Sequence, residues 1–540
     1  MLPAARVGEQ MTVAFTADPG LINERELRAQ MKEWRHGRAT RNVRQALSDG
    51  YIVVLGGLMI GAMIVNVVLQ AQRVASACAV GACLAARLVV PWAVFAGILT
   101  GALVMGRLFG PVLASAAEGS WLLDAPVRRS RLLWTRFVGV MVGAFLVGGL
   151  LGAGVAALTG SSWQAIVAWA GASALGGAGT VAFAGAEQGA NRTIWTRVFS
   201  SVFGWLALLA LLLVVSISAG WISFDLPTAV RLDIALLLGA AALLGLAVCA
   251  VLGLLRLNNI RRARLLSGGS LVAGLSGAFF ALDLGLAHDI VVERKAMEIG
   301  HVRAYRGRGT GPAALVWREL QRTLRFPAPL FGIAATIVVP YACEALGIGG
   351  VAPFISALTL FVSLIGIMGG LRVLTRTGGF ARCLPFSVAR MRVSLITIPA
   401  IVCGVWALAT LPAYLVFGQA SGGTAPYDSF LTSVAVAGAG LIGAVRWTVA
   451  KPIDFGVPMV STQAGAFPPG LMLNLFRGID MCLLITAPLL LHWPPLVALA
   501  IGAIAMGFLL MGGLDAEALK ARQEEQQKQL AQTRAGSGKR

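Results

Sequence analysis

The residues best suited to covalent or metal chemistry are few and widely separated. His36, His288, His301 and His492 are scattered, and the seven cysteines include no Cys-x-x-Cys pair. The chain has no Gly-x4-Gly-Lys-[Ser/Thr] loop to hold phosphates and no Gly-x-Ser-x-Gly elbow to present a nucleophile. We therefore expect no catalytic residue, no metal site and no bound cofactor in this chain.

Charged side chains within apolar stretches are the next candidates, because ionisable groups are costly in lipid. Arg107 falls late in a predicted span, where it either extends to the nearer membrane surface or has a function. Arg477 and Asp480 are three residues apart in a predicted helix, a spacing that favours a structural ion pair over a proton relay. With so few buried acids, proton-coupled transport has little to act through.

The most distinctive segment lies between two long apolar stretches and runs from Glu118 to Arg131. A tryptophan and two leucines give it an apolar side, a proline interrupts any helix, and arginines follow. This pattern is typical of a short helix lying flat on the membrane surface. Its candidate residues are Glu118, Gly119, Trp121, Leu122, Leu123, Pro126, Val127, Arg128, Arg129 and Arg131.

A weaker copy of this segment follows in the second part of the chain. When Pro126 is aligned with Pro385, Gly119 matches Gly378 and Trp121 matches Phe380. The same alignment matches Ala125 with Leu384 and Arg131 with Arg390. The candidate residues of this second segment are Gly378, Phe380, Leu384, Pro385 and Arg390.

Composition identifies the class of protein that must position these segments. Of 540 residues, 57% are hydrophobic and 13% are charged, which is far too apolar for a soluble domain. The 66 glycines favour close helix packing in lipid. We therefore predict an all-α, polytopic membrane protein.

Stretches of about 20 apolar residues predict about twelve spans in two six-span halves. With the N-terminus inside, the loops outside the membrane contain only Arg73, Arg87 and Arg231, and a multi-pass plasma-membrane protein with both termini in the cytoplasm is expected. Cys78 and Cys83 share an outer loop, either as a local disulfide or as two free thiols. The predicted spans are 51–69, 88–113, 137–158, 164–184, 198–217 and 232–255, then 329–346, 351–371, 393–417, 429–445, 470–491 and 495–513.

The remaining segments are predicted to lie in the cytoplasm. Residues 1–50 contain a basic amphipathic helix, and residues 514–540 form a polar tail. The first half spans residues 51–256, the second spans 329–513, and residues 257–328 form a basic linker with surface helices. Within this linker, residues 268–286 are apolar, but Asp283 and the glycines favour a surface-lying or re-entrant helix over another span.

The order of these elements resembles the permease subunits of type-2 ABC exporters. In that family, the segment after the second span is a coupling helix that docks on an ATP-binding subunit. Glu118, Gly119, Leu123, Pro126, Val127 and Arg129 stand at the matching positions. The resemblance implies two separate ATPase subunits, which would hold ATP and magnesium, and export of a hydrophobic or amphipathic substrate. The second segment departs from the pattern, with Thr377 at the position of Glu118 and Ser387-Val388 at that of Arg128-Arg129.

Two other classes fit the same number of spans. A secondary carrier of the major-facilitator kind also has six plus six spans, but the expected Gly-x-x-x-Asp-Arg-x-Gly-Arg-Arg loop is missing. A membrane-embedded scaffold without catalytic residues is the other alternative. Transport driven by a proton gradient would favour the carrier, whereas co-purification with an ATP-binding subunit would favour the exporter.

Overall fold

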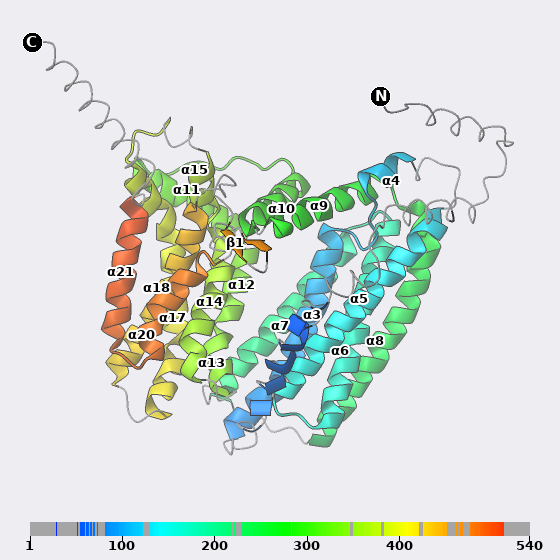
Figure 1. Cartoon of the computed structure of the whole chain (residues 1–540), viewed down its shortest axis with the longest axis horizontal. Coiled ribbons are helices and arrows are strands. Elements are labelled where there is room, and N and C mark those ends of the chain that lie inside the picture. Colours follow the sequence, from blue (N-terminus) through cyan, green and yellow to red (C-terminus); the bar gives the residue numbers. More distant parts are fainter. Residues whose placement is uncertain are drawn as a thin grey trace, which may run out of the picture.

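The computed structural model is helical, with one small β-hairpin formed by β1 (Val460–Thr462) and β2 (Gly465–Phe467) among the described residues (Figure 1). The predicted N-terminal helix apart from Ala29, the tail, several positions of span 51–69 and Cys78 lie outside those residues. The structure describes residues 81–121, 129–218, 221–222, 228–281, 283–345, 349–377, 379, 383–420, 425–450, 460–462, 465–467 and 476–511, with isolated positions between 29 and 73.

Within this described part, nine helices are long and apolar enough to cross a membrane, or ten if one bent pair counts as a single span. Two shorter apolar helices, α20 (Ile479–Leu490) and α21 (Pro495–Met511), accompany them. A helix of about 20 apolar residues spans the hydrocarbon core of a bilayer. The chain is therefore a multi-pass helical membrane protein.

The first group of helices packs through small residues. Phe137 is fully buried, and its ring fills the space beside Gly185 and Gly253 on two neighbouring helices. A Cβ added at Gly185 would lie 2.4 Å from that ring, so only glycine fits there. This group consists of α3 (Gly81–Leu108), α5 (Arg129–Leu158), α6 (Trp163–Gly189), α7 (Ile194–Ser218) and α8 (Thr228–Arg256).

The second group has a core centred on Trp406, which is 1% exposed. The indole Nε1 of Trp406 donates a hydrogen bond to Thr336 Oγ1 at 3.0 Å, so the buried polar atom is satisfied. This group consists of α12 (Ala328–Thr336), α13 (Val338–Ala345), η2 (Gly349–Val351), α14 (Ala352–Leu364), η3 (Ile365–Ile367), α15 (Gly369–Arg376), α17 (Val388–Ala420), α18 (Pro426–Val449), α20 and α21.

The linker between the two groups forms helices at the end of the molecule where the short helix α4 (Ala116–Trp121) also lies. We call this end the α4 end. Figure 1 shows that α9, α10, α11 and α15 lie there as well. The linker helices are η1 (Leu257–Asn259), α9 (Arg262–Phe280), α10 (Leu284–Ile299) and α11 (Pro312–Arg325). The axis of α11 makes an angle of 84° with that of α12 and α13, so α11 lies across the end of its group.

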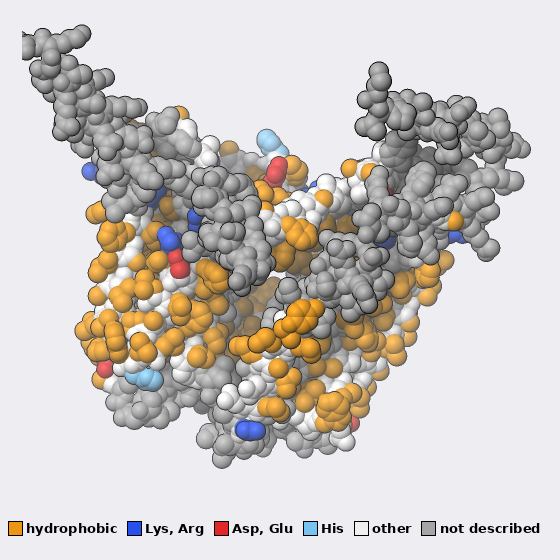
Figure 2. Space-filling model, in the orientation of Figure 1, with side chains coloured by type: hydrophobic (Ala, Val, Ile, Leu, Met, Phe, Trp, Pro, Cys, Tyr) orange, Lys and Arg blue, Asp and Glu red, His pale blue; other side chains and the backbone are white. Residues whose placement is uncertain are grey.

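The two groups contact each other directly at the end opposite α4. Val214, Val215 and Ile217 of α7 pack there with Val338 and Tyr341 of α13. At the α4 end, by contrast, α9 and α10 extend from one group to the other (Figure 1). Figure 2 shows the molecule hollowed between the groups, beneath these two linker helices.

Several predicted spans differ from the helices that form. The stretch 329–346 is two helices that meet at Ile337, and the helix predicted over 351–371 ends at Leu364, where η3 and then α15 take over. The last part of 470–491 alone is helical among its described residues, beginning at Ile479. Hydropathy cannot locate these breaks because the apolar side chains continue through them.

The apolar stretch 268–286 is also divided. The first of the two linker helices, α9, ends at Phe280, and Asp283 then caps the start of α10 by accepting a hydrogen bond from the Leu286 N–H at 3.0 Å. The length and hydropathy of α9 suffice for a span, yet Figure 1 shows it running across the helix groups rather than along them. The cap explains the break, because an aspartate at this position satisfies the free N–H groups of a new helix.

Candidate coupling surface at the α4 end

Glu118 fixes α4 to the helix that follows it. The two Glu118 carboxylate oxygens accept hydrogen bonds from Arg136 of α5, with Nη1–Oε2 at 2.8 Å and Nη2–Oε1 at 2.5 Å. Arg136 Nη1 also donates to the Leu113 carbonyl at 2.8 Å. This guanidinium holds the pKa of Glu118 at about 2, well below its usual range. A bidentate pair of this kind fixes orientation as well as distance.

The start of α4 is a capping box. The Ser115 N–H donates to Glu118 Oε2 at 2.9 Å, and the Glu118 N–H donates to Ser115 Oγ at 3.3 Å. Such a reciprocal pair satisfies two of the free N–H groups at a helix start. Glu118 therefore holds the helix start and the contact with α5 at the same time.

One side of α4, together with the turn before it, packs against α9 through glycines. A Cβ added at Gly119 would lie 2.2 Å from the Leu266 side chain. Gly268 and Gly269 of α9 lie so close to the Phe109 and Ala114 carbonyls that an added Cβ would be 2.0 and 1.9 Å away. The opposite side of α4 remains exposed at Ser115, Ala116, Ala117 and Ser120. The exposed side alone is therefore open to a partner.

A buried glutamine supports the turn between α3 and α4. Gln188 of α6 accepts a hydrogen bond from the Val112 N–H at 3.2 Å and donates to the Val112 carbonyl at 3.1 Å. The turn needs glycine at position 110, where φ is 81° and an added Cβ would lie 2.7 Å from the glutamine amide. This turn ends α3 at Leu108, earlier than the predicted span end at 113.

The structure brings together only part of the first predicted segment. Glu118, Gly119 and the backbone of Trp121 lie in α4, and Arg129 and Arg131 begin α5. The α5 start is joined to the linker, because the Ser130 N–H donates to Asn258 Oδ1 at 2.8 Å. Leu122, Leu123, Pro126, Val127 and Arg128 lie outside the described residues, as does the Trp121 side chain.

The second predicted segment lies between α15 and α17, at the same end of the molecule as α4. The chain bends at 384–386 between α15 and α17, and the Leu384 and Phe386 side chains pack on the core of the second group. Pro385 and Arg390 are exposed, whereas Gly378 and Phe380 lie outside the described residues.

The linker helix α10 is fixed to the second group by an ion pair. Arg372 of α15 is 8% exposed, and it donates to Asp289 Oδ1 at 2.5 Å and to the Gly285 carbonyl at 2.7 Å. The Arg372 guanidinium also lies over the Trp447 ring, 5.2 Å from its centre. With α9 on α4 and α10 on α15, the linker is attached to both helix groups.

His288 completes this contact. Its ring meets the ring of Trp447 edge-on, with the centroids 5.5 Å apart. Burial, with a further contribution from the Arg372 charge, lowers the pKa of His288 to about 4. The histidine is therefore neutral at pH 7 and packs as an aromatic ring.

A second buried charge supports α11. Glu319 is 3% exposed, and it is bound by Arg322 one turn later on α11. Arg322 also donates to the Ile367 carbonyl, and Glu319 Oε1 accepts from the Gly370 N–H at 3.4 Å. These bonds attach α11 to the start of α15, so the amphipathic helix across this group is held by more than its apolar side.

The structure also locates the three charged residues that the sequence placed within predicted spans. Arg107 is in the last turn of α3, near the α4 end, and its Nε is buried without a hydrogen-bond partner among the described residues. Asp480 pairs with Arg446 of α18, whose Nε is 2.9 Å from Asp480 Oδ2. Arg477 precedes α20 in a turn, so the prediction that it shares a helical face with Asp480 was wrong. Helix α20 begins only at Ile479 because Gly478, with φ of 91°, interrupts the backbone there.

Sequence reasoning missed several residues of this surface. Ser115 and Glu118 have the Ser-x-x-Glu spacing of a capping box, so that signal was available. Gln188, Arg372 and Asp289 gave no such signal, because their partners are distant in the chain. Glu187 is also buried, at 7% exposed, and one of its carboxylate oxygens has no hydrogen-bond partner in the part of the chain that the structure describes.

These features define a multi-pass helical membrane protein with two helix groups tied together by linker helices at one end. The sequence profile of the family described as "Family of unknown function (DUF6297)" matches residues 83–458, and the chain belongs to that family. The match runs from α3 to beyond α18, so it includes the linker helices and α4. A comparison with curated proteins found no match.

Proposed function

We propose that this protein is the permease subunit of an ATP-driven exporter of the type-2 ABC kind, with twelve spans in two six-span halves. In this proposal, the α4 end faces the cytoplasm, both termini are cytoplasmic, and separate ATP-binding subunits hold ATP and magnesium. The observation that carries the proposal is the arrangement of the two helix groups. They contact each other through α7, α12 and α13, and at the α4 end of the described part of the chain the linker helices extend between them over a hollow.

The distribution of charge supports this orientation. Arginines of α5, α9, α11 and α15 lie at the α4 end, and short cytoplasmic loops of membrane proteins are enriched in basic residues. The hollow would then lie on the cytoplasmic side of the molecule, beneath the linker helices, and an exporter takes its substrate from that side. Its apolar surroundings favour a hydrophobic or amphipathic substrate.

The contacts of α4 suggest how an ATPase would act on the helices. A force on the exposed side of α4 reaches α5 through the Glu118–Arg136 pair and reaches α9 through the glycine contacts. From α9 it passes to α10 and then to α15 through the Asp289–Arg372 pair. A subunit bound at α4 would therefore move both groups, even if the second segment binds its own ATPase less tightly.

Co-purification from native membranes tests the proposal. Ala117 is exposed on α4, so Ala117→Glu places a charge on the proposed contact without disturbing the interior. We expect the wild-type chain to co-purify with an ATP-binding subunit. The amount of this subunit that co-purifies with the variant should be at least 5-fold lower. Arg390→Glu tests the second segment, with a smaller loss expected. Ala304→Glu, an exposed change in the stretch before α11, is the matched control and should bind as wild type.

Three outcomes would contradict the proposal. An intact complex in both Ala117→Glu and Arg390→Glu would show that these segments are not the contact. Transport by the purified chain in vesicles, driven by a proton gradient without ATP, would assign the protein to the secondary carriers. The absence of any ATP-binding subunit in the wild-type complex would leave the scaffold alternative.

A further inference from the structure

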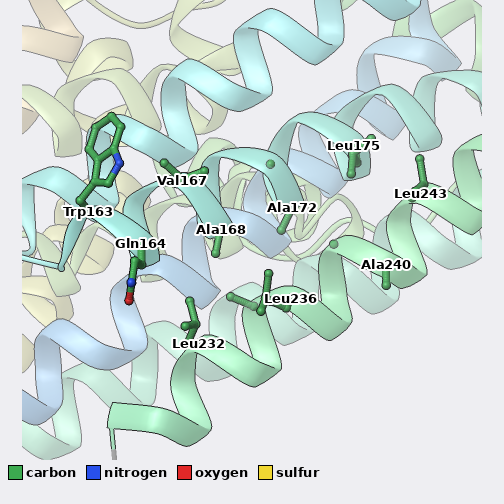
Figure 3. A pocket seen from close by; sticks show the side chains of 13 residues that line it. Trp163, Gln164, Val167, Ala168, Ala172, Leu175, Leu232, Leu236, Ala240 and Leu243 are labelled. Carbon is green, nitrogen blue, oxygen red and sulfur yellow. The ribbon is translucent and has the colours of Figure 1, made fainter.

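A long apolar groove lies between α6 and α8 on the outside of the first helix group. It has a volume of about 600 Å³, which is the size of a small-molecule site. Figure 3 shows side chains of the two helices facing each other along it, including Val167 and Leu175 on α6 and Leu236 and Leu243 on α8. Among the residues that line it, Gln164 has the only amide side chain.

The groove exists because small residues line its floor. Ala168, Gly171 and Ala172 on α6 oppose Gly239 and Ala240 on α8. The helices nearly touch there, since a Cβ added at Gly239 would lie 3.8 Å from the Ala172 Cα. The larger leucine side chains lie on either side of this floor and form the two edges of the groove. Nothing lies within 4 Å of a Cβ added at Gly171, so the space above it is open.

The position and length of the groove match one leaflet of a bilayer. From Trp163 to Leu175 along α6, at 1.5 Å per residue, it extends about 18 Å. Half of the bilayer hydrocarbon is about 15 Å thick. Because α5 begins beside α4 and α6 runs back from the other end, Trp163 lies at the end opposite α4. The groove therefore begins near the membrane surface and ends near the middle.

The two residues at the outer end differ in character from the rest. Trp163 is 76% exposed, and tryptophan is the residue typical of the boundary between hydrocarbon and headgroups. Gln164 beside it is exposed as well, and its amide both donates and accepts hydrogen bonds. The groove is thus polar only where a lipid headgroup would lie, and apolar where a chain would run.

We propose that this groove binds one acyl chain of a phospholipid from the leaflet opposite the α4 end, with the headgroup beside Gln164. The occupant follows from the combination of apolar walls, one-leaflet length and a polar outer end. A transmembrane helix of a partner would not need the polar group to be confined to one end. The proposal concerns the bare chain and does not depend on an ATPase or on transport.

Photo-crosslinking with a labelled lipid tests the site. The purified chain is placed in vesicles of phosphatidylethanolamine and phosphatidylglycerol that contain a trace of phosphatidylglycerol with a diazirine on one acyl chain. Mass spectrometry then maps the attached lipid. We expect attachment to residues 163–175 and 232–243 at least 5-fold above that on the exposed face of α5.

Two substitutions fill the groove from opposite walls, so failure of one to fold does not end the test. Gly171→Leu occupies the open space on α6, and Ala240→Phe occupies it from α8. Each should reduce attachment in the groove at least 5-fold. Gly143→Leu on α5 is the matched control, because Gly143 is exposed and an added Cβ there also meets nothing within 4 Å. It should leave attachment unchanged.

Either of two results would overturn the proposal. Equal attachment along all exposed helices, unaffected by Gly171→Leu and Ala240→Phe, would show only bulk lipid beside the protein. Peptide crosslinks from a second copy of the chain into residues 163–175 would show that the groove is a contact between copies. Thermal unfolding of each variant in detergent confirms that loss of attachment reflects the groove and not the fold.

Discussion

Glu118 has a larger role than its place in a surface segment suggested. Its carboxylate caps the first turn of α4 through Ser115 and grips Arg136 on α5. In a membrane protein, a short helix outside the lipid has little apolar surface to bury, so polar contacts decide its position. The Glu118 side chain therefore fixes α4 against α5, while the glycine contacts hold α4 against α9.

Glu118→Gln should weaken this attachment. The neutral amide keeps its size but loses the charge that holds Arg136, and we expect a loss of roughly 1 kcal/mol, as for a partly exposed ion pair. Because the folded-state pKa of Glu118 is lowered to about 2, its contribution is complete above pH 4.5 and disappears as the pH falls through 2. Thermal unfolding in detergent between pH 5 and pH 2 measures both effects.

The control for Glu118→Gln is Ser120→Ala, which removes an exposed hydroxyl that donates to carbonyls of its own helix. This variant should show the pH dependence of the wild type. If Glu118→Gln kept that full dependence too, another carboxylate would be responsible for it.

The contribution of His288 to stability should be lost over a different pH range. Its folded-state pKa of about 4 lies below the usual 6.5, so the folded chain favours the neutral ring. Its contribution is therefore complete above pH 6.5 and is lost as the pH falls toward 4. Asp289, Lys295 and Arg372 are the charged groups that face this ring.

His288→Phe should remove this loss while keeping the ring contact with Trp447. The unfolding temperature of the variant should change less than that of the wild type between pH 6.5 and 4.5. His301→Phe, a change at an exposed histidine, is the control and should behave as wild type. A wild-type unfolding temperature that stayed constant over that range would show that α10 does not depend on a neutral His288.

At the scale of elements, α9 is the helix that the sequence described least well. Its glycines looked like weakness for a span, but they are what allows α9 to touch the turn before α4. The close approach places the Ala114 N–H 3.2 Å from the Leu265 carbonyl, a backbone hydrogen bond between the turn and the helix. The small residues of α9 therefore attach the linker to the first helix group.

Gly269→Val should separate α9 from α4. Its Cβ would lie 1.9 Å from the Ala114 carbonyl oxygen, so the helix must shift, and overpacking of this kind costs about 1–3 kcal/mol. We expect a lower unfolding temperature and faster amide exchange over residues 112–121. Gly277→Val on the same helix meets nothing within 4 Å and should change neither by as much. Equal effects of the two variants would mean that valine only weakens the helix.

At the scale of the whole molecule, orientation in the membrane is the property on which the proposed function depends. The α4 end and the end that carries Trp163 and Trp493 are opposite ends of the helix groups. If the α4 end faces the cytoplasm, only the tryptophan end is reachable from outside the cell. The linker, which attaches to both groups, would then be entirely cytoplasmic.

Cysteine labelling in intact cells checks this orientation. In a chain whose seven cysteines are replaced by alanine, Trp163→Cys and Trp493→Cys should react with a membrane-impermeant thiol reagent. Ser120→Cys and Ala304→Cys, both exposed at the α4 end, should react only after the cells are opened. Labelling of Ser120→Cys in intact cells would reverse the orientation and remove the proposed coupling surface.

The sequence was informative wherever a signal is local. The excess of apolar residues predicted a multi-pass helical membrane protein, and the structure confirms that class. The short helix at Glu118 was predicted from residues next to one another in the chain. The sequence did not indicate that the predicted span at 351–371 would end at Leu364, because apolar side chains continue past that residue.

By itself, then, the sequence determined the class of the protein, the approximate place of most spans and the candidate segments, because hydropathy and charge act residue by residue. Tertiary structure alone decided which of these parts touch: Arg372 with Asp289, Gln188 with Val112, and the glycines of α9 with the turn before α4. Those contacts join positions far apart in the chain. Their energy comes from geometry that exists only after the helices have packed, so no local pattern contains it.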